Sequence, residues 1–142
     1  MLVIEQVKEI NAEIVDALSR LMLQLSPDGK IPGRVNLERI VSRKGSYLFI
    51  ARNPDIIATL TLLVAESPLG AKAWIEDVIV DKEARGQQVG EKLLIHAIDF
   101  AKTLDISSIN LTSMPERVAA NKLYHKVGFE KRETNVYRLM IR

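Results

Sequence analysis

Residues 74–94 of the chain read WIEDVIV, then DKEA, then RGQQVG, then EKLL. This pattern predicts a buried strand over residues 74–80, a turn with two glycines, and the start of a helix. The first turn of a helix leaves about four backbone N–H groups without partners, and the helix dipole adds positive potential there. A strand that enters a helix through such a turn therefore predicts a site for an anionic phosphate group.

The residues of this turn are the first candidates for ligand binding. Gly86 and Gly90 allow the main chain to turn tightly and to approach a ligand, and Arg85 adds a cation. The other residues expected at the phosphate site are Gln87, Gln88, Val89 and Glu91. The turn lacks both the Gly-Lys-Ser/Thr ending of a Walker loop and the glycine pattern of a dinucleotide fingerprint. From these residues alone, an ordinary strand–helix turn stays an open alternative.

Hydrophobic periodicity on either side of the junction predicts an α/β (α+β) chain. Strands are expected over residues 2–7, 46–52, 56–66, 73–80 and 108–112. Helices are expected over residues 8–25, 36–42, 88–104 and 116–127. A closing hairpin is expected from residues 129–132 and 135–141.

The connections predict how these elements are joined. Short turns at residues 53–55 and 67–70 indicate an antiparallel meander of three strands. A helical crossover then places the strand at residues 108–112 parallel to the strand at residues 73–80. Residues 26–35 contain two prolines and two glycines and are expected to form a loop, with Asn36 as the cap of the following helix. The predicted order is β-α-α-β-β-β-α-β-α-β-β in a mixed, mostly antiparallel sheet.

Length and composition limit the classes of protein that the chain can represent. Its 142 residues fit a single domain over residues 1–142, and a net charge of +2 does not favour nucleic-acid binding. Because cysteine is absent, a cysteine nucleophile and a cysteine-based zinc site are excluded, and no metal is expected. Neither a signal peptide nor a membrane span is expected, and a cytoplasmic location fits this composition.

Two motifs resemble those of the GNAT superfamily of N-acetyltransferases. The turn at residues 85–90 resembles the acetyl-CoA-binding motif Arg/Gln-x-x-Gly-x-Gly/Ala, although Gln88 stands where relatives commonly have glycine. The segment AANKLYHKVGF at residues 119–129 resembles the superfamily's Ala-x-x-Leu-Tyr-x-x-x-Gly-Phe ending. The order of elements is also similar, so the resemblance covers essentially the whole chain and implies a single GNAT domain.

The resemblance implies direct transfer of an acetyl group from acetyl-CoA, as cosubstrate, to a primary amine. Tyr124 is then expected as the general acid and Glu76 as the base, acting through water. The backbone N–H groups of Val78, Ile79 and Val80 are expected to hold the thioester oxygen and the pantetheine arm. The alternatives for these positions are a packing tyrosine, a solvated acid and an ordinary buried strand.

Five further residues are assigned roles from the resemblance or from their position. Asn121 and Arg117 are expected near the cofactor, although Arg117 could equally lie on a solvated helix face. Asp77 is expected near the substrate amine; it can face the same side as Glu76 only if a β-bulge re-aims one of them. Lys30 and Arg34, in the loop, are candidates to meet an acidic or phosphorylated acceptor.

The acceptor is the main alternative that the sequence leaves open. A small amine such as an amino sugar, an amino acid or a polyamine is the first hypothesis, and an amine of a peptide or protein is the second. A module that binds acetyl-CoA without catalysis, as a sensor, is the hypothesis from another class. A homodimer that pairs through the C-terminal hairpin is also considered.

Overall fold

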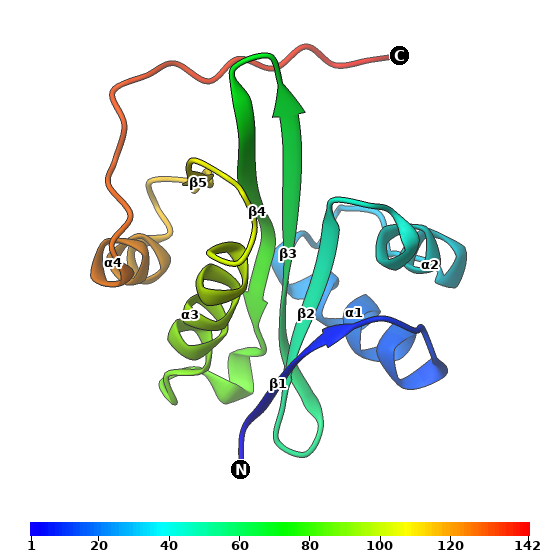
Figure 1. Cartoon of the computed structure of the whole chain (residues 1–142). Coiled ribbons are helices and arrows are strands. Elements are labelled where there is room, and N and C mark those ends of the chain that lie inside the picture. Colours follow the sequence, from blue (N-terminus) through cyan, green and yellow to red (C-terminus); the bar gives the residue numbers. More distant parts are fainter. The chain divides into compact units, whose positions relative to one another are not determined.

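The computed structural model describes the whole chain, Met1–Arg142, which divides into two compact units. The first unit, Met1–Thr112, contains the sheet and three α-helices, and the second, Ser113–Arg142, contains one α-helix and the C-terminal segment (Figure 1). None of the helices combines the length and the apolar character that crossing a membrane requires.

The sheet of the first unit has five strands in the order of the sequence. They are β1 (Val3–Val7), β2 (Ser46–Arg52), β3 (Ile56–Ser67), β4 (Gly70–Val80) and β5 (Ile109–Asn110). The first four strands are antiparallel neighbours, whereas β5 is parallel to β4. The predicted meander and the parallel crossover are therefore confirmed, and the β3–β4 hairpin is longer than expected because β4 begins at Gly70.

Helices cover both faces of this sheet (Figure 1). On one face, α1 (Ala12–Leu25) and α2 (Arg34–Ser42) pack in a common core with Leu48 and Ile50 of β2. Between these two residues, Phe49 faces the other side, where its ring meets Phe100 of α3 (Val89–Ala101) at 5.3 Å between centroids. This alternation along β2 is the pattern of a central strand that is buried on both faces.

The starts of the first two helices are set by their capping residues. The Asn11 side chain accepts a hydrogen bond from the Ile14 N–H at 2.9 Å, so α1 begins at Ala12 and not at residue 8. The prediction that Asn36 caps the second helix is wrong. Gly33 occupies the cap position, and its carbonyl accepts from the Leu37 N–H at 3.1 Å, so α2 begins at Arg34.

The second unit contains α4 (Val118–Val127), which ends at Gly128 as predicted. Gly128 has a φ of 111°, a left-handed conformation that glycine adopts without a steric penalty. The predicted closing hairpin is not formed, because residues 129–142 are in no strand. The apolar residues of its expected second strand are at least 66% exposed: Val136, Tyr137, Leu139, Met140 and Ile141. Two short strands without a further partner are marginal in water, which is the physical reason for the difference.

Candidate functional site

A β-bulge in β4 brings two acidic residues to one face of the sheet. Glu76 lies opposite Thr61, and Ile79 lies opposite Thr59, so two residues of β4 span a single position of β3. Asp77, inside the bulge, has a φ of 53°, which is unusual for a residue with a side chain. Residues that lie opposite each other share a face. Glu76 therefore faces the α1 and α2 side, and Asp77 lines a cavity on that same side.

The proximity of these two acids alters the proton affinity of Glu76. Partial desolvation raises the pKa of the Glu76 carboxyl, and the neighbouring Asp77 carboxylate raises it further. A carboxylate with a raised pKa holds a proton more readily, which is the property that a general base needs.

Beyond the bulge, β4 presents main-chain groups at an edge that has no strand partner. The Asp81 N–H donates to the Ile57 carbonyl at 2.7 Å, and Ile79 is paired with Thr59 of β3. Because successive residues of a strand direct their N–H and C=O groups to opposite edges, these groups of Val78 and Val80 point away from β3. β5 pairs with β4 only at Ala73 and Trp74, so it does not reach them.

The turn between β4 and α3, where the sequence predicts a phosphate site, contains two residues with a left-handed backbone. Gly86 has a φ of 83°, and a Cβ at this position would have no heavy atom within 4 Å. Gln88, the cap residue of α3, is also left-handed, with a φ of 62°, and its side chain makes no capping hydrogen bond. The amides of Val89 and Gly90 follow at the start of the helix. Arg85 donates from Nε to the Val80 carbonyl at 3.3 Å.

A polar network anchors the beginning of this turn to α1. The Arg20 guanidinium pairs with the Asp81 carboxylate and also donates to the Ile56 carbonyl at 2.9 Å. Gln24 donates to Asp81 at 3.3 Å, and its own side-chain oxygen accepts from the Lys82 N–H at 3.0 Å. Burial acts to raise the pKa of Asp81, but these hydrogen bonds, the Glu83 amide and the Arg20 charge outweigh it and lower the pKa.

A cavity of about 420 Å³ lies between the sheet and the loop and helices on the bulge side. Its apolar lining comes from α1, α2, β2 and the preceding loop: Leu18, Met22, Ile31, Leu37, Ile40 and Leu48. Its charged lining residues are Asp77 and Lys30, and Asn36 and Thr61 add polar groups. This volume is in the range of sites that hold small molecules.

The two loop cations that the sequence singled out differ in their surroundings. Lys30 lines the cavity. Arg34 does not, because its guanidinium donates to the Ile10 carbonyl at 3.0 Å and lies 4.0 Å from the Glu38 carboxylate. The structure therefore brings Lys30 together with Asp77, and it engages Arg34 elsewhere.

The second unit holds the remaining candidates. Tyr124 is buried, and its ring meets that of Phe129 edge to face at 6.1 Å between centroids. Burial raises the pKa of the Tyr124 hydroxyl, and the Arg117 charge offsets part of this effect. Asn121 donates to the carbonyls of Met114 and Arg117 at 2.9 and 2.8 Å, so both of its N–H groups already hold the turn that precedes α4.

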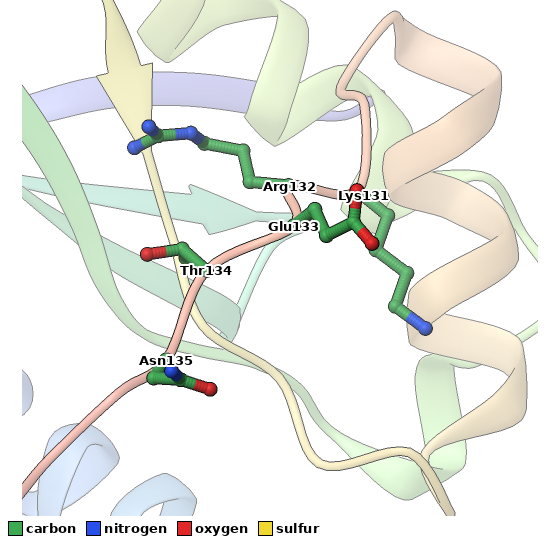
Figure 2. A pocket seen from close by; sticks show the side chains of 5 residues that line it. All are labelled: Lys131, Arg132, Glu133, Thr134 and Asn135. Carbon is green, nitrogen blue, oxygen red and sulfur yellow. The ribbon is translucent and has the colours of Figure 1, made fainter.

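A further hollow, of about 510 Å³, runs along the C-terminal segment (Figure 2). Its lining consists of consecutive residues, Lys131 to Asn135, and Figure 2 shows that the Lys131 and Arg132 side chains extend away from each other. None of the candidate residues lines this hollow, and its wall is irregular chain without hydrogen bonds. It is therefore not the candidate site.

The sequence did not indicate the apolar part of the cavity or the network at Asp81. Leu18 and Met22 have the helical spacing of ordinary core residues. Thr61 lies in a strand, and no motif around it in the sequence marks it as a cavity residue. Arg20 and Gln24 are four residues apart on α1, which was a detectable signal that one helix face carries two polar side chains.

Comparison with known proteins agrees with this geometry. A family model described as the acetyltransferase (GNAT) family matches residues 12–129, which include α1 to α4 and all strands except β1. The chain therefore belongs to the acetyltransferase (GNAT) family. The match includes both the turn at residues 85–90 and the segment at residues 119–129.

Solved structures of low sequence identity have the same fold. An aminoglycoside acetyltransferase from an uncultured soil metagenomic sample has a TM-score of 0.84 and 22% identity, over 99% of this chain and 97% of that chain. A glucosamine-6-phosphate N-acetyltransferase from Arabidopsis thaliana has a TM-score of 0.79 and 20% identity, over 99% of both chains. A transcriptional regulator from Bacillus halodurans has a TM-score of 0.80 and 24% identity, over 99% of this chain and 100% of that chain. The predicted GNAT fold is confirmed.

Proposed function

We propose that the protein transfers the acetyl group of acetyl-CoA to the primary amine of a small molecule. The observation that carries this proposal is the bulge at Asp77, which brings Glu76 and Asp77 to the cavity side of the sheet, with Asp77 in the cavity lining. Next to the bulge, one edge of β4 has no strand partner. Similar structures include acetyltransferases whose names state an aminoglycoside or glucosamine 6-phosphate as substrate, which supports a small acceptor.

The residues present fit acetyl-CoA. The edge without a strand partner offers the N–H groups of Val78 and Val80 to the pantetheine arm, whereas Ile79 is paired with β3 and the Val80 carbonyl already accepts from Arg85. The left-handed turn at Gly86 and Gln88 and the start of α3 offer amides to the phosphates. In the same proposal, Arg85, Gln87 and Glu91 contact the cofactor. Arg117 and the side-chain oxygen of Asn121 are also proposed as contacts, since the N–H groups of Asn121 already donate to Met114 and Arg117.

The proposed chemistry is one acyl transfer with balanced protons. Acetyl-CoA supplies a thioester whose carbonyl carbon accepts the amine nitrogen. Glu76 removes one proton from the ammonium form of the acceptor through water, which frees the nitrogen lone pair. As the N–C bond forms and the C–S bond breaks, Tyr124 protonates the sulfur and regains a proton from the nitrogen. The net products are an amide, a thiol and one proton.

Replacement of either proposed proton-transfer residue tests this function. Tyr124→Phe and Glu76→Gln are each expected to lower kcat by about 100-fold or more, because general acid–base catalysis contributes on this scale. Release of free thiol from acetyl-CoA in the presence of a panel of amines measures kcat. Calorimetric titration with acetyl-CoA is expected to give a Kd within about twofold of the wild-type value.

Matched variants separate this effect from general damage. Tyr137→Phe removes the hydroxyl of a tyrosine that is 86% exposed, and Glu66→Gln removes a charge from the exposed end of β3. Both are expected to keep wild-type rates. If acetyl-CoA binds but no amine accelerates thiol release, the chain is a sensor and not a catalyst. If acetyl-CoA neither binds nor raises Tm, both functions are excluded.

A further inference from the structure

The cavity beside the bulge contains two opposite charges that the protein leaves without partners. Asp77 makes no hydrogen bond or salt bridge through its side chain, and Lys30 makes none either. Both residues are exposed overall, and each also borders the apolar wall of the cavity. Two unpaired charges of opposite sign at one cavity fit a ligand that carries both charges.

The wall between the two charges determines the body of this ligand. It is formed mainly by aliphatic side chains and a methionine of α1, α2 and β2, with Leu18 and Leu37 themselves buried. Burial of apolar surface stabilises a bound ligand by about 25 cal/mol per Å². The Thr59 hydroxyl cannot donate to a ligand, because its hydrogen is already donated to the Phe49 carbonyl at 2.8 Å.

We propose that the acceptor is an amino acid: a primary amine and a carboxylate on a compact apolar body. The amine lies at Asp77, next to Glu76, and the carboxylate lies at Lys30. This assignment rests on the proposed acetyl transfer and specifies its substrate class.

The same cavity disfavours the acceptors that similar structures suggest. An aminoglycoside carries several ammonium groups, and a single carboxylate, Asp77, lines the cavity. A hexosamine presents several hydroxyl groups, each of which needs a hydrogen-bond partner when it is buried, and the lining offers few. The phosphate of a sugar phosphate would pair with Lys30, but its polar sugar ring would lie against the apolar wall.

A set of matched acceptors measures these preferences with the wild-type protein. The set contains leucine, leucinamide, spermidine and glucosamine 6-phosphate, and thiol release gives kcat/KM for each. Leucine is expected to exceed leucinamide by about 10-fold or more, since a hydrogen bond to a charged group contributes about 1.5–3 kcal/mol. Leucinamide carries the less basic amine, so a larger fraction of it is unprotonated at neutral pH, and basicity would favour leucinamide. A preference for leucine is therefore assigned to recognition of its carboxylate.

Two variants test whether Lys30 recognises the carboxylate of the acceptor and Asp77 its amine. Lys30→Met keeps the apolar stem but removes the ammonium, and the preference for leucine over leucinamide is expected to fall to about twofold or less. Asp77→Asn is expected to lower kcat/KM for every amine, and asparagine tolerates the left-handed backbone of this position. Lys44→Met, at an exposed lysine outside the cavity, is the control and is expected to keep the preference.

The outcomes separate this inference from the proposed function. If spermidine or glucosamine 6-phosphate is the better acceptor, or if Lys30→Met leaves the preference intact, the inference is overturned while acetyl transfer stands. If no amine in the set or in a wider panel accelerates thiol release, acetyl transfer itself is overturned.

Discussion

At the scale of single residues, Gln88 holds the turn at residues 85–90 in a conformation that costs stability. Its backbone is left-handed, a conformation that costs a residue with a Cβ about 1–2 kcal/mol. The GNAT motif commonly has glycine at this place, and glycine has no such cost. Gln88 still supplies a backbone N–H, so the turn keeps its donors while the chain carries the strain.

Substitutions at two adjacent residues reveal this strain. At position 88, Gln88→Gly is expected to be more stable than Gln88→Ala by about 1 kcal/mol, because only alanine meets the left-handed penalty. At position 87, where φ is not positive, the order is expected to reverse, because glycine loses more entropy on folding. Urea unfolding of the four variants measures both differences. The same order at both positions would contradict the assignment of strain to residue 88.

At the scale of elements, the network at Asp81 joins α1 to the turn that precedes α3. The Asp81 carboxylate accepts hydrogen bonds from Arg20, Gln24 and the Glu83 N–H. The side-chain oxygen of Gln24 also accepts one from the Lys82 N–H. The position of the turn at residues 85–90 therefore depends on a helix that is distant in sequence, since 61 residues separate Arg20 from Asp81.

Removal of the Asp81 charge tests this connection. Asp81→Asn is expected to lower the free energy of unfolding by about 1–3 kcal/mol, since it removes a partly buried ion pair and weakens several hydrogen bonds. Asp99→Asn, in an exposed pair 3.9 Å from Lys102, is the control and is expected to cost less than about 0.5 kcal/mol.

The pH dependence of this effect has a defined sign. The pKa of Asp81 is lower in the folded protein than in the unfolded chain. The stabilisation is therefore complete above the ordinary aspartate range and is lost as pH falls through the lowered pKa. Chemical unfolding of wild type and Asp81→Asn across this range is expected to show the two stabilities converging at acidic pH. A difference that is independent of pH would exclude the ion pair as its cause.

Elements with a strong periodic pattern of their own could be predicted from the sequence. α1 and β2–β4 were found because their apolar residues repeat at helical or strand spacing. The cap at Gly33 was missed because asparagine is a more usual capping residue than glycine, which favoured Asn36. Which of the two positions begins the helix depends on tertiary packing. The apolar wall of the cavity was missed because it combines residues of α1, of α2 with its preceding loop, and of β2, which only the folded chain brings together.

At the scale of the whole molecule, the C-terminal segment differs from the rest of the chain. No backbone hydrogen bond is made beyond the Phe129 N–H, and the apolar residues that follow are exposed. A strand forms only where another backbone receives its hydrogen bonds, and local sequence does not reveal whether that partner exists. This is why residues 135–141 have the pattern of a strand without its structure.

Limited trypsin digestion tests this description of the segment. Cleavage is expected first after Arg132 and Arg138, well before cleavage after Lys92 in α3, because exposed backbone without hydrogen bonds enters a protease site readily. Mass spectrometry of the early products identifies the sites. Protection of both arginines that increases with protein concentration would instead indicate pairing of this segment with a second copy of the chain.

The bulge at Asp77 also restricts how the length of β4 can vary. Ile75 faces the α3 side and Ile79 faces the α1 and α2 side, so the strand alternates in opposite phases before and after the extra residue. One residue more or fewer between them would move every following side chain of β4 to the opposite face of the sheet and would also turn the connection to α3. We therefore expect a single insertion or deletion in this stretch to disrupt the fold, whereas the Ser67–Gly70 end of the hairpin is expected to accept one.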